Sequence, residues 1–137
     1  MSGFDIFSIA GSAMSAESVR LNVTASNLAN AQSVGSSEAT TYRARSPVFA
    51  SMVKAFQEPE SGYGVQVKGV VEIGGPLQQQ YRPDHPLANE QGYIFLPNVN
   101  VADEMANMIA ASRAYQTNVE VLNTSKQMIL ATLRLGR

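Results

Sequence analysis

The stretch that decides the fold spans residues 98–135 and reads NVNVADEMANMIAASRAYQTNVEVLNTSKQMILATLRL. Large side chains recur there at every seventh position, namely Met108, Tyr115, Leu122 and Ile129. A second set begins three residues earlier and comprises Met105, Ser112, Val119, Lys126 and Leu133. Alternating steps of three and four residues are the period of a heptad seam on an α-helix. The pattern therefore predicts a helix over residues 101–133 with one apolar seam.

The ends of this predicted helix are also marked in the sequence. Asn100 can cap the first turn, and Asp103 and Glu104 place negative charge just inside it. Arg134 and Gly136 are typical of a last turn. At about 1.5 Å per residue, the helix would be roughly 50 Å long. A helix of that length cannot cover its own seam, so it requires a partner.

The N-terminal segment repeats the same period. Its large side chains at every seventh position are Phe7, Met14, Leu21 and Leu28. The interleaved set is mostly small, which would let a neighbouring helix approach closely, and comprises Phe4, Gly11, Ser18 and Ala25. Ser2 is a candidate cap. We expect the two terminal helices to pack together in a coiled-coil-like manner, giving a discontinuous helical domain of residues 1–34 plus 98–137.

The residues between the helices predict a small β-rich insertion, residues 35–97. β-Branched residues occur at strand spacing from Val65 to Ile73, and the Gly74-Gly75-Pro76 sequence stops that strand. Residues 77–81 and 92–97 are two further extended segments, whereas residues 42–56 stay ambiguous between strand and helical turn. Residues 35–40 are predicted as a flexible entry. The fold class is mainly α with this small β module.

Composition excludes several partners. The chain has 137 residues, 10 Lys and Arg against 11 Asp and Glu, and no basic cluster, so nucleic acid is not an expected partner. It has no Cys, and no apolar run approaches the roughly 20 residues of a membrane span. The N-terminus lacks the basic and apolar regions of a cleaved secretory signal. We expect a protein that is not inserted in a membrane.

Charge is scarce on both predicted helices. Charged residues make up 15% of the chain, against about 25% in a typical soluble domain. A two-helix pair would also leave apolar side chains uncovered, including Ile6, Ile9, Ile109, Val121, Met128 and Leu130. We interpret both features as signs of assembly with other copies of the chain. A compact monomer with a mild surface remains an alternative.

The candidate assembly residues are the large side chains of both seams, Phe7, Met14, Leu21, Leu28, Met105, Met108, Tyr115, Val119, Leu122, Ile129 and Leu133. A soluble coiled-coil adaptor would share these seams. Such adaptors normally carry charged residues beside the seam, and these are scarce here.

The sequence offers little that indicates catalysis. His85 is the only histidine; it follows Asp84 and lies between two prolines, so a structural role in a turn is favoured over that of a catalytic base. A metal site would have to use carboxylates whose spacing follows no ligand pattern, Glu58, Glu60, Asp84 and Glu90. The glycines do not form a phosphate-binding loop. We expect no catalytic, cofactor-binding or metal-binding residue, no cofactor and no small-molecule substrate.

Several segments nevertheless resemble a known family. ASNLANA at residues 25–31 is similar to the segment shared by bacterial flagellar rod and hook axial proteins. The further matching segments, in order, are YRARSPVF at 42–49, GVQV at 64–67, YRPDHPLA at 81–88, GYIFLPNVNV at 92–101, EMANMI at 104–109 and RAYQTN at 113–118. At this chain length they resemble the proximal-rod members of the family. A neighbouring rod subunit is the nearest alternative, whereas the short middle module argues against the larger distal-rod and hook relatives.

The resemblance implies a structural subunit of the flagellar basal body. Such subunits are exported through the flagellar type III apparatus without signal cleavage, and they join other rod proteins in the periplasm to form a shaft that carries torque. It also implies an inner domain made of the terminal helices and a β-rich outer part. Because isolated helices are marginal in water, we expect the terminal arms to be partly disordered before assembly.

Overall fold

The computed structural model describes residues 3–52 and 64–136. In chain order the elements are α1 (Gly3–Asn30), β1 (Arg45–Met52), β2 (Gly64–Glu72), β3 (Gln78–Tyr81), β4 (Tyr93–Leu96) and α2 (Val101–Leu135). Two long helices flank a small antiparallel β module, so the predicted fold class is confirmed.

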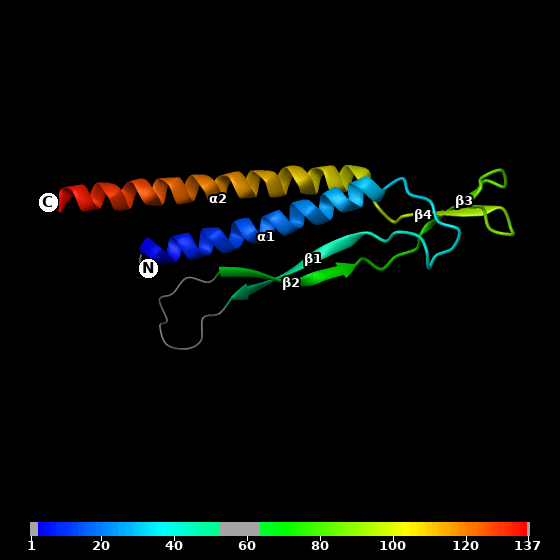
Figure 1. The fold of residues 1–137 in the computed structure, drawn as a ribbon, viewed down its shortest axis with the longest axis horizontal. Helices are drawn as coiled ribbons and strands as arrows, with labels where there is room; N and C mark the ends of the chain where they lie inside the picture. Colours follow the sequence, from blue (N-terminus) through cyan, green and yellow to red (C-terminus); the bar gives the residue numbers. More distant parts are fainter. Residues whose placement is uncertain (1–2, 53–63, 137) are drawn as a thin grey trace.

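The elements form an elongated molecule. α1 and α2 lie antiparallel side by side, the β1–β2 hairpin covers another side of α1, and β3 and β4 extend beyond the end where α1 stops and α2 begins (Figure 1). The C-terminal turns of α2 continue past the start of α1 (Figure 1). The fold therefore presents one long helical flank and one end formed by α2 alone.

The ends of α2 follow the sequence signals. Asn100 is the N-cap, and its side chain accepts a hydrogen bond of 3.0 Å from the Ala102 backbone N–H. At the other end the Gly136 N–H donates to the Thr132 carbonyl over 3.2 Å. The helix runs to Leu135, two residues further than predicted. The predicted cap of α1, Ser2, lies outside the described residues.

The β1–β2 hairpin settles the ambiguous segment as a strand. Its antiparallel register runs from Arg45↔Glu72 to Met52↔Gly64, with a bulge between Val48 and Phe49. Pro47 is accommodated opposite Val70 because a strand in a two-stranded sheet needs backbone hydrogen bonds on one edge only. The expectation of a helical turn reaching Phe56 falls on residues outside the described part of the chain.

The second β unit contains a small apolar core. β3 pairs with β4 from Gln78↔Leu96 to Tyr81↔Tyr93, and Ile94 and Phe95 of β4 are buried. Gly35 exchanges two backbone hydrogen bonds of 3.0 Å with Phe95. Residues 35–40 were predicted as a flexible entry; instead Gly35 is buried, because this pairing adds it to the sheet beside β4.

Asn98 joins the base of the hairpin to the start of α2. Its Oδ1 accepts a hydrogen bond of 2.8 Å from the Ala44 N–H, and its Nδ2 donates to the Ile73 carbonyl over 3.0 Å. Ala44 and Ile73 flank the first and last residues of the hairpin ladder. The predicted domain boundary between residues 97 and 98 stays a prediction.

Candidate assembly surface

The contact between the two helices uses small side chains. Ala111 of α2 is 0% exposed and Ser125 is also buried, while Ala10 is buried on α1. Small side chains at a helix contact allow the two backbones to come close together. The most deeply buried positions of this contact are therefore small residues that hydrophobicity alone would not select.

The most buried residues of α2 belong to a heptad set other than the predicted second set. The positions that accompany the set of Met108 on the buried side are Glu104, Ala111, Asn118 and Ser125, all buried or half-buried. The predicted set beginning at Met105 lies one residue further round the helix, and Met105 is 53% exposed. Of the predicted second set, Ser112 and Val119 are half-buried, whereas Met105, Lys126 and Leu133 are exposed; the assignment of this set to an assembly seam stays a prediction.

The predicted assembly residues fall into two groups. Half-buried within the chain are Phe7, Met14, Leu21, Leu28, Met108, Val119, Leu122 and Ile129. Exposed are Met105, Tyr115 and Leu133. A single chain contains no interface between subunits, so the role of both groups in assembly stays a prediction.

Other large apolar side chains of α2 are exposed as well. The predicted exposure of Ile109, Val121, Met128 and Leu130 is confirmed, and Val101 and Leu135 join them. Ile6 and Ile9 of α1 are instead half-buried. Leu135 belongs to a series of residues spaced seven apart, which starts with Asn107 and Ala114 and continues through Val121 and Met128. The polar and small start of that series gives no apolar signal.

The side chains of that series are half-buried at its N-terminal end and exposed at its C-terminal end. Asn107 and Ala114 are half-buried, whereas Val121, Met128 and Leu135 are exposed. Arg20 contacts Asn107, and equal steps along the antiparallel helices from that contact bring Gly3 beside Thr124. α1 therefore has no described residue left to cover the last turns of α2.

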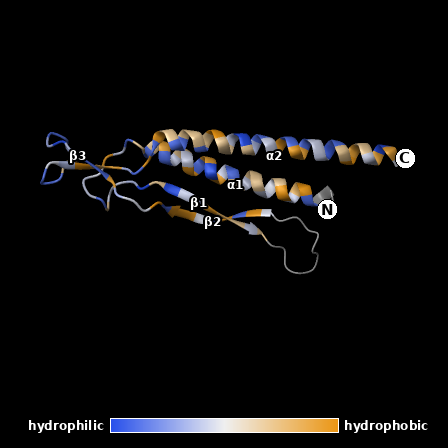
Figure 2. Ribbon diagram, turned by 180° about the vertical axis from the view of Figure 1, so that it is seen from behind, coloured by the Kyte–Doolittle hydropathy of each residue, from blue (hydrophilic) through white to orange (hydrophobic). Residues whose placement is uncertain are grey.

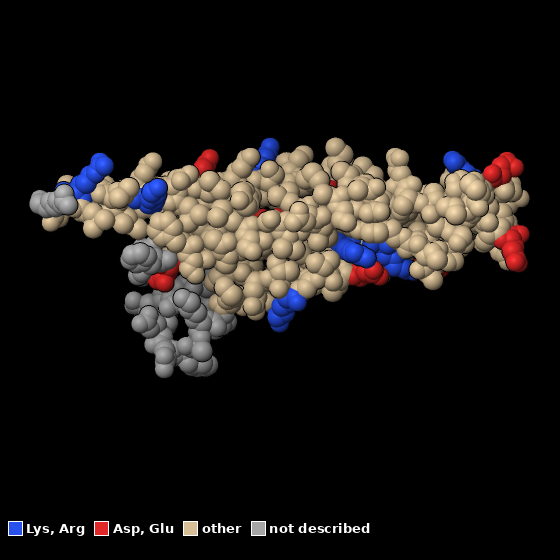
Figure 3. All heavy atoms as spheres, in the orientation of Figure 1, with Lys and Arg blue, Asp and Glu red and all other residues tan. Residues whose placement is uncertain are grey.

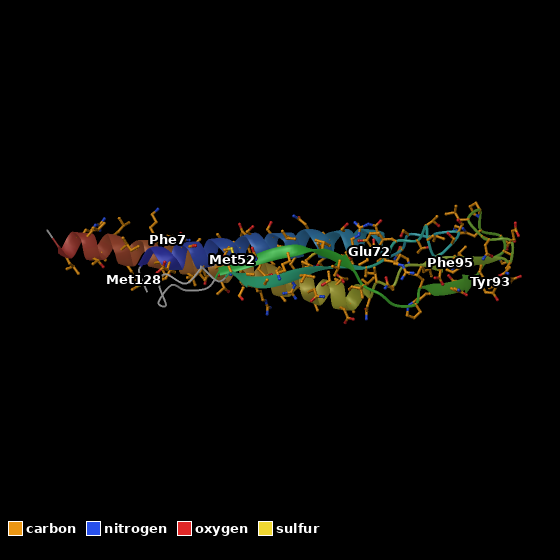
Figure 4. The ribbon with its side chains drawn as sticks, turned by 90° about the horizontal axis from the view of Figure 1, so that it is seen from below. Phe7, Met52, Glu72, Tyr93, Phe95 and Met128 are labelled. Atoms are coloured by element: carbon orange, nitrogen blue, oxygen red, sulfur yellow. The ribbon has the colours of Figure 1, made fainter. Side chains whose placement is uncertain are left out.

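We call residues 126–135 the α2 overhang. Met128 is 66% exposed, Leu133 is 65% exposed and Leu135 is 87% exposed. A shallow depression of about 460 Å³ is lined by Gln127, Leu130, Ala131, Arg134 and Leu135. Figure 4 shows Met128 close to the end of α1 that carries Phe7. The overhang thus exposes large apolar side chains beside Lys126 and Arg134, and its last turns continue past the described start of α1.

The hairpin exposes apolar side chains on both of its faces. Val48, Phe49 and Met52 on β1 and Val70 and Val71 on β2 are exposed, and consecutive residues such as Val70 and Val71 point to opposite faces. Figure 2 shows apolar stretches along the hairpin that are interrupted by polar ones. A two-stranded sheet is marginally stable alone and here leans on α1 on one side. Its other side remains available to a neighbour.

Charges interrupt these surfaces only sparsely. Figure 3 shows isolated charged side chains on a mostly uncharged face. The exposed stripe of α1 is uncharged and consists of Ser8, Ser15, Ser18, Asn22, Ala25, Ser26 and Ala29. The ion pairs Arg45–Glu72 at 3.5 Å and Arg43–Glu38 at 3.8 Å lie at the surface, where such pairs contribute at most about 1 kcal/mol. Like-charge repulsion would therefore be small if copies packed side by side.

The described residues provide little that could bind a reactant. A cleft of about 330 Å³ opens where α1, α2 and the hairpin meet, and its lining includes Arg20, Arg45, Phe49 and Glu104. His85 lies in a turn, where its Nδ1 accepts a hydrogen bond of 3.1 Å from the Leu87 N–H. Within residues 3–52 and 64–136, neither helix is both long and apolar enough to cross a membrane, and His and acidic side chains do not gather as metal ligands would.

Comparison with known proteins identifies similar chains. Residues 7–35 match the family described as flagella basal body rod protein, and residues 90–135 match the C-terminal family of the flagellar basal body rod FlgEFG proteins. The flagellar basal-body rod proteins FlgC of Yersinia enterocolitica and Salmonella typhimurium are each 50% identical over 137 residues, covering 100% of both chains. That of Escherichia coli O157:H7 is 51% identical over the same full length.

Proposed function

The chain belongs to the FlgC family of flagellar basal-body rod proteins, and we propose that it builds the rod by packing the exposed apolar rows of its helices against neighbouring subunits. The relatives are named as basal-body rod proteins, which describes a structural subunit and not an enzyme. The partners are other copies of the chain and other rod proteins of the basal body.

One observation carries the packing mechanism. The heptad series of α2 that α1 covers at Asn107 and Ala114 continues uncovered through Val121, Met128 and Leu135. A row that is already half-buried at its first two positions has the right period to receive a second helix over the other three. The overhang therefore extends the intrachain helix contact into an intersubunit one.

The polarity of this contact suits an open polymer. The overhang lies at one end of the molecule, and the β3–β4 unit lies at the other (Figure 1). A surface that binds a different surface on the next copy gives a head-to-tail contact, which continues into a helical array when it does not close. Interlocked apolar side chains would then resist slippage when the shaft transmits torque from the motor to the hook.

The location and the export route of the subunit are part of the proposal. We propose that the subunit is located in the periplasmic part of the rod and reaches it through the flagellar type III export apparatus without cleavage of a signal peptide. The uncharged exposed stripe of α1 fits a subunit surrounded by other helices, since its Ser, Asn and Ala side chains permit close approach. No nucleic acid, cofactor or small-molecule substrate has a part in this function.

A labelling experiment tests the proposed packing. The chain has no Cys, so Met128→Cys and Leu133→Cys each introduce a single thiol on the overhang. We expect a maleimide reagent to label both variants readily in the free subunit and slowly in purified basal bodies. Equal labelling rates in the two states would show that the overhang stays uncovered and that the packing mechanism is wrong.

A further inference from the structure

The hairpin is attached to α1 through Asn27. This side chain is 1% exposed; its Nδ2 donates to the Arg45 carbonyl over 2.8 Å, and its Oδ1 accepts from the Arg45 N–H over 2.9 Å. The same oxygen accepts a hydrogen bond of 2.9 Å from the Tyr42 hydroxyl. The Asn27 amide thus pairs with both backbone groups of Arg45, as a neighbouring strand would, and it closes the outer edge of β1 at that residue.

A second attachment lies near the other end of the hairpin. The Val65 N–H of β2 donates a hydrogen bond of 3.1 Å to Ser12 Oγ, which itself donates to the Ile9 carbonyl over 2.8 Å. The backbone comes close to α1 here, since a Cβ atom on Gly64 would lie 2.9 Å from Ser12 Oγ. Met52 and Glu72, at opposite ends of the hairpin, mark the distance that these attachments span (Figure 4).

The two attachment points match in length. Ser12 and Asn27 are fifteen positions apart on α1, which is about 22 Å at helical rise. On the hairpin, Val65 is paired with Ser51, and Arg45 is paired with Glu72. The corresponding spans are about 20 Å along β1 and about 23 Å along β2. The hydrogen bonds of Ser12 with Val65 and of Asn27 with Arg45 can therefore form at the same time in only one register of the hairpin along α1.

The remaining contacts do not fix that register as strongly. Apolar packing between a helix and a sheet is non-directional, and it changes little when one surface slides by a fraction of a residue. A hydrogen bond is lost within such a slide, and a buried group left without its partner costs free energy. Asn98 holds the base of the hairpin to the segment before α2, not to α1 itself.

We propose that Ser12 and Asn27 are positioning residues that set the register of the β1–β2 hairpin along α1. Through this register they fix the height along α1 at which the exposed apolar side chains of the hairpin meet a neighbouring subunit. The first statement concerns the single chain, and only the second rests on the proposed function. Neither residue is a seam position, so neither is explained by the helix contact.

Distance measurements between spin labels test the register. One label pair at Ser8 and Gln66, both exposed, joins α1 to β2, and a second pair at Ser8 and Glu120 joins α1 to α2. We expect the Ser12→Ala/Asn27→Ala double variant to broaden the distribution of the first pair and to leave the second narrow. Asn27→Ala alone should speed hydrogen exchange of the hairpin amides by about tenfold or more, because three hydrogen bonds are lost. The matched control is Ser15→Ala/Asn22→Ala, which alters exposed positions of the same helix.

Each outcome decides the proposal. A narrow Ser8–Gln66 distribution in the double variant, or equal broadening of both pairs, would overturn it, since the hairpin would then be held by other contacts or the whole subunit would have loosened. The control must keep both distributions narrow. In a bacterium lacking its own copy of the gene, the double variant should lose motility; retained motility would overturn the second statement. The labelling of basal bodies described above uses neither residue, so it tests the proposed function separately.

Discussion

Arg20 Nη2 on α1 donates a hydrogen bond of 3.1 Å to Asn107 Oδ1 on α2. Because the helices are antiparallel, the residues that follow Asn107 on α2 lie beside the residues that precede Arg20 on α1. This contact therefore sets how far the two helices overlap. The overlap ends near Thr124, where α1 begins. The length of the uncovered overhang is thus a consequence of the helix register.

The close contact at Ala111 should not tolerate a larger side chain. Ala111 is fully buried between the helices, so Ala111→Leu should force them apart and reduce the free energy of unfolding by about 1–3 kcal/mol. Urea unfolding of the free subunit measures this. Ala110→Leu is the matched control, because Ala110 is exposed and the change should stay within about 0.5 kcal/mol.

Hydrogen exchange in the free subunit should follow a gradient along α2. The sequence predicts partly disordered arms, whereas the structure packs them against each other around Ala111. We therefore expect the slowest amides near Ala111 and rapid exchange in the α2 overhang, since local opening is easiest where few side chains are buried. Mass spectrometry of exchanged peptides measures the gradient, and uniform slow exchange to Leu135 would contradict it.

Leu122 should be required for assembly. This half-buried seam residue lies on the same helix row as Met108, and Leu122→Asp would place a charge among apolar side chains, where an unpaired charge is costly. We expect export of the subunit to persist while rods and motility are lost. Asn123→Asp adds the same charge at an exposed neighbouring position and should leave motility intact; motile cells with Leu122→Asp would refute the seam assignment.

The substitution Leu133→Asp should impair assembly without destabilising the folded subunit. Because Leu133 is exposed on the overhang, Leu133→Asp should change the free energy of unfolding by no more than about 0.5 kcal/mol. Rod formation should nevertheless fail, since a charge would stand on the overhang that is proposed to pack against the next subunit. Circular dichroism of the free subunit and electron microscopy of basal bodies measure the two effects, and normal rods would count against the overhang as an interface.

His85 should be dispensable for function. Its ring accepts one exposed hydrogen bond from the Leu87 N–H, so His85→Ala should cost at most about 1 kcal/mol of stability. Motility should be unchanged, because the residue serves a turn and not a reaction. A swimming assay on soft agar measures this, and a non-motile strain containing a stably folded His85→Ala subunit would reopen the question of a specific role for the histidine.

Much of the fold was predictable because its signals are local. The period of Phe7, Met14, Leu21 and Leu28 follows from the geometry of one helix, and the Asn100 cap follows from the donors that any helix start exposes. The strand from Gly64 was similarly marked by β-branched residues and by the glycines after it. The sequence left the segment of β1 ambiguous because Pro47 disfavours a central strand. The structure accommodates this proline because β1 belongs to a two-stranded sheet.

The sequence by itself determined that two long helices of heptad period flank a short β module and carry too few charges for a solvated surface. Only the tertiary structure decided which positions face the partner helix. The contact at Ala111 and Ser125 depends on how closely two backbones can approach, and apolar periodicity does not record that distance. The attachment of Arg45 to Asn27 likewise depends on packing between distant segments, which brings one amide side chain to the open edge of a strand.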